Sequence, residues 1–366
     1  MAEWVMKKLK DIADFNPRES LAKGVVAKKV TMDKLQPFCR DILRYELEPF
    51  SGGTKFRNGD TIMARITPCL ENGKTAKVAG LDDGEIGFGS TEYIVFRAKD
   101  GVDEDFIYYL VCSPLVREPA IKSMVGSSGR QRVQTDVVQN LEIMVPDYDE
   151  QKRISSILKS LDDKIAANTE VNKNLAAQAQ AIYQEIFITN ADEAWPIGHL
   201  SDLINLKYGK DHKKLANGSF PVYGSGGVMR HVERPLYDKE SVLIPRKGTL
   251  NNVIYVNKPF WSVDTMFYSE MKHPQIAKFV FHYLNGKDLA SLNAGSAVPS
   301  MTTAILNAME LRIPDDVALN KFEEIVSPMY LAIADNNIQS VKLAALRDVL
   351  LPKLMSGEID VSGLDL

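Results

Sequence analysis

Cysteine is scarce in this chain of 366 residues. Cys39, Cys69 and Cys112 are the only three, and no two of them form a Cys-x-x-Cys pair. An odd number of widely spaced cysteines argues against a disulfide framework and against a thiolate zinc site. The cysteine pattern therefore predicts a protein of the reducing cytoplasm.

Long hydrophobic runs are missing as well. No apolar stretch approaches the roughly 18–20 residues that span a bilayer, and residues 1–4 lack the basic-then-apolar pattern of a secretory signal. We therefore expect no association with a membrane.

The chain also lacks an excess of positive charge, because its formal net charge is −4. The distribution is uneven: residues 196–315 hold 14 Lys and Arg against 10 Asp and Glu, a net +4, whereas the acids gather in 149–195 and 316–366. Bulk charge therefore does not argue for a nucleic-acid partner, but it leaves one open.

Residue patterns typical of catalytic sites are absent. The five histidines form no His-Glu-x-x-His pair, and the sequence has neither a serine nucleophile elbow nor the glycine-rich loop and Asn/Asp-Pro-Pro-aromatic motif of S-adenosylmethionine enzymes. Gly73-Lys74-Thr75 matches the end of a P-loop, but Pro68 stands where its first glycine belongs. Glu150-x-Lys152 matches part of the residue pattern of a nuclease metal site. It lies at a predicted helix start, however, where acidic side chains interact favourably with the helix dipole. We predict a non-catalytic binding protein with no metal site and no cofactor of its own.

The chain repeats itself. Residues Trp4, Leu9, Asp11 and Ile12 recur 191 positions later as Trp195, Leu200, Asp202 and Leu203. The offset falls to 168 at Glu142-Ile143-x-Val145-Pro146-Asp147, which recurs as Glu310-Leu311-x-Ile313-Pro314-Asp315, and it stays at 168 through Leu175-Ala176-Ala177 and Leu343-Ala344-Ala345. One half of each repeat is fixed in length and the other varies, as expected of a rigid scaffold and a recognition surface.

The fixed halves carry apolar or small residues at alternating spacings of four and three, which predicts two long helices of roughly 60 Å. The first seam is Ile154, Leu158, Leu161, Ile165, Asn168, Asn172, Leu175, Ala179, Ile182 and Ile186. The second is Phe322, Val326, Met329, Ile333, Asn336, Ser340, Leu343, Leu350 and Leu354, with a break at Arg347 where Leu346 is the expected substitute.

Local signals predict where these helices begin and end. Pro146-Asp147 and Pro314-Asp315 are typical of starts, Gly357 of an end, and Pro328 should kink the second helix or mark its true start. We expect the helices to pack antiparallel as a coiled coil, with Asn168 and Asn336 fixing the register. Packing of each helix only into its own domain is the alternative.

The variable halves predict compact domains of mixed strands and helices. Strands are expected over residues 60–66, 92–97, 241–246 and 253–256, and short helices from 106 and over 276–284. The predicted fold class is α/β (α+β), with two similar variable domains at 1–147 and 193–315 and the two long helices within 148–192 and 316–366.

Polar, glycine-rich loops with single basic residues are the remaining candidates for a binding surface. Arginine and glutamine suit base edges, and Lys, hydroxyl and amide groups suit phosphates. The candidates in the first domain are Arg65, Thr67, Lys74, Ser127, Ser128, Arg130, Gln131 and Arg132. Those in the second are Tyr223, Ser225, Arg246, Lys247, Thr249, Asn251, Asn252, Thr265, Ser296 and Ser300. For any one loop an ordinary solvated turn is the simpler interpretation, but Arg65 and Arg246, and the two Gly-Ser loops, occupy matching places.

Taken in order, five motifs make the chain resemble the specificity (S) subunit of type I restriction–modification systems. They are Pro-Val-Tyr-Gly-Ser-Gly-Gly at 221–227, Ile-Pro-Arg-Lys-Gly-Thr at 244–249, Pro-Phe-Trp-Ser-Val-Asp-Thr at 259–265, Gly-Ser-Ala-Val-Pro-Ser at 295–300 and Leu-Leu-Pro-Lys-Leu-Met-Ser-Gly-Glu-Ile at 350–359. The first domain departs from the pattern, since Ser90-Thr91 stands in place of Asp264-Thr265.

The resemblance implies two target-recognition domains that each read one half of a bipartite site in double-stranded DNA, with the helices setting the spacer. It implies two methylation (M) subunits docked on the helices and two restriction (R) subunits in the full complex. The adenine methyltransferase and ATP-dependent endonuclease activities, with S-adenosylmethionine, ATP and magnesium, would belong to those partners.

Two other hypotheses stay open from the sequence. A protein-only coiled-coil scaffold with two ligand-binding heads would suit the negative net charge, and would show no salt-sensitive affinity for DNA. A self-sufficient nuclease or methyltransferase would show activity as an isolated chain.

Overall fold

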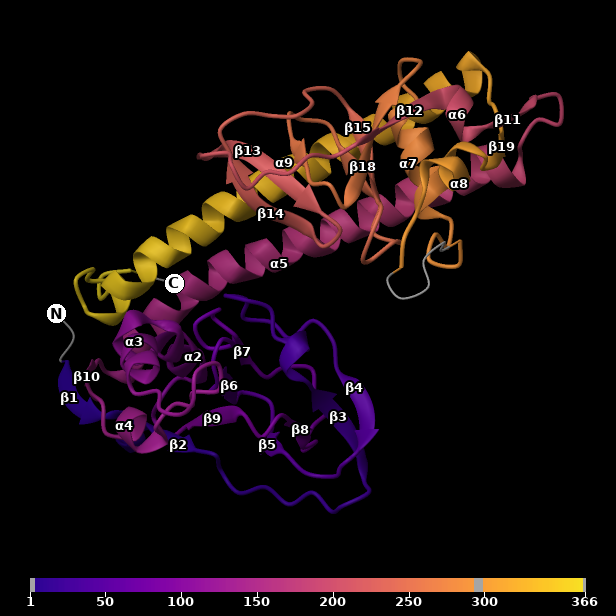
Figure 1. Ribbon diagram of the computed structural model, residues 1–366. Helices are drawn as coiled ribbons and strands as arrows, with labels where there is room; N and C mark the ends of the chain where they lie inside the picture. The colour runs from indigo at the N-terminus through magenta and orange to yellow at the C-terminus, as the bar shows by residue number, and fades with distance from the viewer. Residues whose placement is uncertain (1–3, 293–298, 365–366) are drawn as a thin grey trace. The chain divides into compact units, whose positions relative to one another are not determined.

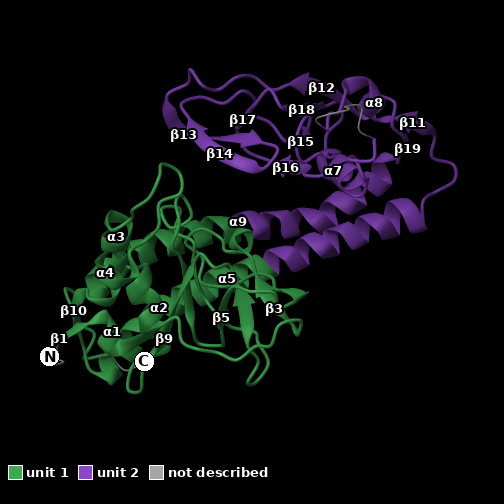
Figure 2. Cartoon of the chain, turned by 60° about the horizontal axis from the view of Figure 1, so that its bottom comes forward, with its two compact units in different colours: residues 1–170, 335–366 green, residues 171–334 purple. Residues whose placement is uncertain are grey.

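The computed structural model describes residues 4–292 and 299–364 (Figure 1). The chain divides into two compact units, residues 1–170 with 335–366 (unit 1) and residues 171–334 (unit 2) (Figure 2). Each unit contains one variable domain and a stretch of both long helices. The fold class is the mixed α/β arrangement predicted from the sequence.

The main sheet has four antiparallel strands in the same order in both units. In unit 1 the order is β2 (Ala13–Phe15), β9 (Tyr93–Ala98), β6 (Thr61–Ala64) and β7 (Thr75–Lys77). In unit 2 it is β12 (Ile204–Tyr208), β18 (Met266–Met271), β15 (Ser241–Pro245) and β16 (Ile254–Val256). The repeat seen in the sequence is therefore a repeat of topology.

A second sheet is also shared, with one difference. Unit 1 has β4 (Glu46–Pro49), β3 (Val26–Val30), β8 (Gly87–Gly89) and β5 (Thr54–Phe56), and unit 2 has β14 (Gly227–Val232), β13 (Asn217–Gly224) and β17 (Trp261–Ser262). The pairs β3–β8 and β13–β17 are both parallel. Strand β5 of unit 1 has no counterpart in the described part of the unit 2 sheet.

Short elements repeat as well. Each unit pairs a strand near the start of its domain with one just before a long helix: β1 (Val5–Lys8) with β10 (Glu142–Val145), and β11 (Ile197–His199) with β19 (Glu310–Arg312). The short helices of unit 1 are α1 (Leu9–Ile12), η1 (Met32–Lys34), α2 (Glu104–Cys112), α3 (Pro114–Lys122) and α4 (Thr135–Gln139). Those of unit 2 are α6 (Leu200–Leu203), α7 (Ala277–Asn285) and α8 (Thr303–Asn307). Helices α2 and α7 are largely buried and join the main cores.

The two long helices begin at the predicted aspartates. Helix α5 spans Tyr148–Gln184 and continues as a π-helical turn, Glu185–Thr189, while α9 spans Asp316–Met355. The carboxylates of Asp147 and Asp315 each accept a hydrogen bond from the backbone N–H three residues later, at 2.9 and 2.8 Å, which satisfies an otherwise unpaired amide of the first turn.

The C-terminal end of α9 also follows the prediction. Gly357 has a φ of 74°, the left-handed conformation that favours glycine past a helix end. Pro328 does not mark the true start of this helix, because α9 begins twelve residues earlier and runs through it. In Figure 1, α5 and α9 are the two long ribbons, drawn in magenta and yellow.

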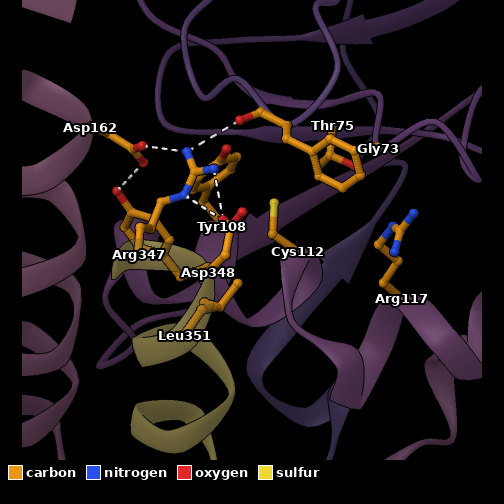
Figure 3. A pocket seen from close by; sticks show the side chains of 11 residues that line it. Gly73, Thr75, Tyr108, Cys112, Arg117, Asp162, Arg347, Asp348 and Leu351 are labelled. Carbon is orange, nitrogen blue, oxygen red and sulfur yellow. Dashed lines mark hydrogen bonds and ion pairs between the residues drawn. The ribbon is translucent and has the colours of Figure 1, made fainter. Parts of the chain in front are cut away.

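In unit 1 the helices pack antiparallel through polar groups as well as apolar ones. The Asn168 side-chain amide donates to Gln339 Oε1 at 2.8 Å, to Ser340 Oγ at 3.2 Å and to the Asn336 carbonyl at 3.4 Å. Arg347 fills its own seam position, because its guanidinium pairs with the Asp162 carboxylate at 2.7 Å (Figure 3). The expected substitution by Leu346 was wrong: Leu346 is 47% exposed, since the buried ion pair already occupies the seam.

In unit 2 the helices pack through aromatic and apolar side chains. Ala179, Tyr183 and Phe187 of the first helix share a buried cluster with Phe322 and Val326 of α9. The rings of Phe187 and Phe322 meet edge to face with centroids 5.2 Å apart. The predicted antiparallel pairing of the helices is thus present in each unit, with different chemistry.

Candidate functional site

Matching residues of the two domains can be identified from strand register. Ala64 pairs with Tyr93 in unit 1, and Pro245 pairs with Met266 in unit 2, at the ends of β6 and β15. The next residues are Arg65 and Arg246. Their backbone amides donate to the equivalent carbonyls, Arg65 to Glu92 at 2.9 Å and Arg246 to Thr265 at 2.8 Å. The two arginines predicted to match therefore occupy the same place in each unit.

The same register corrects one detail of the sequence alignment. It makes Thr91-Glu92 of unit 1, and not Ser90-Thr91, equivalent to Asp264-Thr265 of unit 2. The shift by one residue arises because the turns before β9 and β18 differ in sequence. The hydrogen bonds that link these turns to Arg65 and Arg246 are the same in both units.

In each unit a third segment of the chain is hydrogen-bonded to the backbone of this arginine. The Val133 amide donates to the Arg65 carbonyl at 2.9 Å, and the Met301 amide donates to the Arg246 carbonyl at 2.9 Å. Thr67 and Gln131 are linked by a backbone hydrogen bond of 3.0 Å, and Lys247 forms a bridge with Ser300. The end of β6 or β15, the turn before β9 or β18 and the loop before α4 or α8 thus meet at one point in each unit.

In unit 1 the predicted residues divide by exposure. Ser127, Ser128 and Arg130 are exposed, and Gln131 is half-buried beside them. Arg132 is committed to Glu92, with contacts of 2.7–3.0 Å from two of its nitrogens. Hydrogen bonds from Arg132 hold the pKa of the Glu92 carboxyl below its usual value.

Two further unit 1 candidates point to internal partners. Lys74 Nζ donates to the Met32 carbonyl at 2.8 Å, and Thr67 Oγ1 donates to Glu71 Oε1 at 3.0 Å. Both side chains therefore support the loop that follows β6.

In unit 2 the cluster around Arg246 brings several predicted residues together. Arg246 lies with its guanidinium carbon 5.4 Å from the centre of the Tyr208 ring and donates to the Asp264 carbonyl at 3.2 Å. Asn252 donates to the Ser225 carbonyl at 2.7 Å, which ties the Tyr-Gly-Ser-Gly-Gly turn to the loop after β15. Lys247 and Thr249 are exposed beside this contact, and Thr265 is half-buried.

Three other predicted residues of unit 2 are placed differently. Tyr223 is 9% exposed and lies in a buried cluster with Phe260, so its ring is part of the core. Asn251 is held by Asp288 and the Ala290 amide, at 3.0 and 2.9 Å. Ser296 lies outside the described residues.

Residues that the sequence analysis missed surround Arg65. An open cleft of about 490 Å³ lies beside it and is lined by Asn16, Pro17, Arg18, Glu19, Gly53, Thr54, Lys55, Arg65, Thr91 and Tyr93. These residues come from the segment after β2, from β5 and from the turn before β9. No short motif joins them, so only the fold reveals the site.

Each domain is anchored to the helix pair by residues at equivalent positions. Helices α2 and α7 match residue for residue at an offset of 173, which makes Tyr109 equivalent to His282. The Tyr109 hydroxyl donates to Asp162 at 2.8 Å, and the His282 ring contacts the Tyr330 hydroxyl at 2.9 Å. Asp162 and Tyr330 are themselves separated by the repeat offset of 168.

The charges along these two contacts are reversed. Asp105 of α2 pairs with Lys159 of α5 at 3.2 Å, whereas the equivalent Lys278 of α7 pairs with Glu323 of α9 at 2.5 Å. At this equivalent position each domain therefore carries the charge opposite to that of its own helix partner.

The buried contact of unit 1 encloses a small cavity, lined among others by Phe38, Cys112, Arg117 and Leu351 (Figure 3). Burial raises the pKa of the Cys112 thiol to about 12, so the thiol stays protonated and unreactive at neutral pH. This cavity belongs to the scaffold.

Neither a metal site nor a membrane span is found in the part of the chain that the structure describes. No three His, Cys, Asp or Glu side chains among residues 4–292 and 299–364 gather as metal ligands would. None of the helices in these ranges combines the length and the hydropathy needed to cross a bilayer.

The family model "Type I restriction modification DNA specificity domain" matches residues 1–177 and 192–340, which include both variable domains and part of each long helix. The chain is similar to the type I restriction enzyme MjaIX specificity subunit of Methanocaldococcus jannaschii, with 23% identity over 312 residues, 73% of this chain and 71% of that protein. It is similar to the Escherichia coli EcoAI specificity subunit at 39% identity over 104 residues, 28% of this chain and 18% of that one.

Among solved structures, the type I restriction–modification S subunit from M. genitalium has a TM-score of 0.59 at 18% identity, covering 99% of this chain and 97% of that chain. At this identity the likeness concerns the fold.

Proposed function

The chain belongs to the family of type I restriction–modification DNA specificity proteins, and we propose that it is the DNA-reading subunit of such a complex. Each domain reads one half of a bipartite target in double-stranded DNA. The observation that carries the proposal is that the family model matches both repeats of this chain. The chain itself is non-catalytic, as this family of specificity subunits is.

We propose that the loops around Arg65 and Arg246 face the DNA. The support is geometric: in each unit, three segments far apart in sequence meet at an arginine, beside exposed hydroxyl, amide and basic groups. Arginine can bind guanine O6 and N7 through two hydrogen bonds, and Lys, Ser and Thr can hold phosphates. The proposed contacts are Arg65, Ser127, Ser128, Arg130 and Gln131 in unit 1, and Ser225, Arg246, Lys247, Thr249 and Ser300 in unit 2.

The paired helices are proposed to set the gap between the half-sites and to dock the methylation subunits. The support is that the helical half of each repeat keeps a constant offset of 168 residues while the domains vary in length. Two methylation subunits and two restriction subunits would complete the assembly in the cytoplasm. The partners would supply S-adenosylmethionine, ATP and magnesium, and with them adenine methylation and cleavage.

Selection from random DNA duplexes tests the proposal. The full chain, co-purified with its methylation subunit, should enrich one motif of two short half-sites with a fixed gap, and its affinity should fall steeply as salt rises. Arg246→Ala should weaken discrimination at one half-site and leave the other unchanged. Binding without any sequence preference would reject the proposal.

The same experiment separates this proposal from the protein-only scaffold. A scaffold predicts no salt-dependent DNA affinity, and family membership favours DNA recognition over it.

A further inference from the structure

The open cleft at Arg65 in unit 1 is rich in hydrogen-bond donors. Arg18 is exposed and makes no ion pair within the described residues, while Lys55 and Arg65 line the same cleft. Asn16 accepts the Val95 amide through its side-chain oxygen at 2.9 Å, and its NH₂ group is available as a donor to a ligand. The Arg65 guanidinium donates to the Val133 carbonyl at 3.3 Å, and its buried Nε has no hydrogen-bond partner among the described residues.

The one carboxylate in the cleft is already neutralised. Glu19 contacts Arg97 at 2.6 Å and Arg57 at 3.2 Å, and its side chain is only 12% exposed. Arg97 in turn makes two hydrogen bonds of 2.7 Å to the buried carboxylate of Asp60. The lining therefore offers three cations, of which Lys55 also donates to the Glu19 carbonyl at 2.8 Å, and two threonine hydroxyls, and the described lining residues include no unpaired carboxylate.

The floor of the cleft is a built feature of the fold. Thr54 pairs with Gly89 in the β5–β8 ladder, and Gly53 has a φ of 117°. A Cβ at Gly53 would come within 2.0 Å of the Gly89 carbonyl oxygen, so only glycine fits there. This close approach places Thr54 and Lys55 beside the segment that carries Asn16 and Arg18.

The corresponding place in unit 2 is built differently. Phe15 and Leu206 are equivalent by register, and 50 positions separate Phe15 from Arg65 whereas 40 separate Leu206 from Arg246. The first copy thus has ten more residues here, in the stretch that contains β5. In unit 2, Tyr208 stands at the position of Pro17 and stacks near Arg246.

We infer that the cleft of unit 1 binds a backbone phosphate of the DNA. The second domain has Gly209 at the place of Arg18, and its described sheet has no strand equivalent to β5, which carries Lys55. The inference rests on the proposed function. Three cations beside one already paired carboxylate favour a charged phosphate, whose oxygens accept hydrogen bonds from all three, over the neutral edge of a guanine. Arg18 and Lys55 hold the phosphate, and Arg65 completes the site from the strand end.

Salt titration on DNA of random sequence tests this contact. The full-length wild type, the Arg18→Ala and Lys55→Gln variants and the double variant, each co-purified with the methylation subunit, are titrated with a random-sequence duplex, and log K is plotted against the log of the salt concentration. Because both side chains hold the same phosphate, the double variant should lower the slope by about 1, and each single variant by part of that amount. Lys122→Ala, on α3 and with a side chain that is 79% exposed, is the matched control and should leave the slope unchanged.

Selection from random duplexes distinguishes a backbone phosphate from a guanine edge as the group that the cleft binds. A phosphate contact predicts that Arg18→Ala enriches the same motif as the wild type. Loss of preference at a single base pair with an unchanged salt slope would show a guanine edge and overturn the inference. Wild-type binding with an unaltered slope in the double variant would also overturn it, whereas failure of the wild type to bind DNA would reject the proposed function itself. Thermal melting of each variant checks that it folds.

Discussion

The carboxylate of Asp162 and the guanidinium of Arg347 form a buried ion pair, 2.7 Å apart, between the two long helices of unit 1. Their side chains are 6% and 11% exposed. The Tyr109 hydroxyl also donates to Asp162, so the pair connects both helices to the domain. Burial by itself would lower the pKa of Arg347, but the charge and hydrogen bonds of Asp162 raise it above its usual value.

Removal of one partner should leave the other charge buried and unpaired. We expect Arg347→Ala to lower the free energy of unfolding by about 3–5 kcal/mol, measured by urea denaturation of the full chain. Lys353→Ala is the control, because the Lys353–Glu358 pair is 44% and 63% exposed and should contribute at most about 1 kcal/mol. Equal losses in the two variants would contradict a buried, structurally important pair.

The reversed charges of the two domain contacts predict a specific rescue. Lys278→Glu should destabilise unit 2, because it places two carboxylates where a 2.5 Å ion pair with Glu323 now lies. Adding Glu323→Lys should restore part of the loss, with a coupling energy of about 0.5–3 kcal/mol in a double-mutant cycle. The exposed pair Lys207–Glu270 serves as a control cycle and should show little coupling. Strictly additive effects at 278 and 323 would argue against direct pairing.

His282 should make unit 2 sensitive to acid. Burial lowers the pKa of His282 to about 4 in the folded protein, below the roughly 6.5 of an unfolded histidine. The unfolded chain therefore binds this proton first, and stability falls as pH drops from about 6.5 toward 4. The histidine should account for about 1–2 kcal/mol of lost stability between pH 6.5 and 5.

Unfolding curves at these two pH values, compared between wild type and His282→Gln, measure this contribution. The variant should lose the steeper part of the pH dependence, whereas His199→Gln should not, because the His199 side chain is 51% exposed. An unchanged pH dependence in His282→Gln would contradict the assignment.

The proposed role of the paired helices in setting the gap between half-sites can be tested by shortening them. Deleting seven residues from both helices, 167–173 and 335–341, removes two helical turns from each and keeps the seam facing inward. The rod shortens by about 10 Å, roughly three base pairs of DNA, so selection should return the same half-sites with a shorter gap. Deletion in one helix alone should abolish binding by misaligning the seams. Altered half-site sequences in the double deletion would show that the helices take part in base recognition.

Much of the architecture was predictable because it depends on local and periodic signals. The constant offset of 168 and the seam spacing predicted two long paired helices, and Asp147, Asp315 and Gly357 predicted their ends. The alignment of Arg65 with Arg246 held because each follows a buried strand, whose register fixes the next residue. Leu346 was misplaced because spacing alone cannot show that Arg347 has a buried partner.

The sequence by itself determined the duplicated plan, the helix ends and the matching of the two arginines, since these follow from patterns within short stretches of chain. Only the tertiary structure decided which side chains meet across long separations: Tyr109 with Asp162, Lys278 with Glu323, and Arg18 with Lys55 and Arg65 around one cleft. Such contacts depend on how sheets and helices pack against each other, and that packing leaves no regular spacing in the sequence.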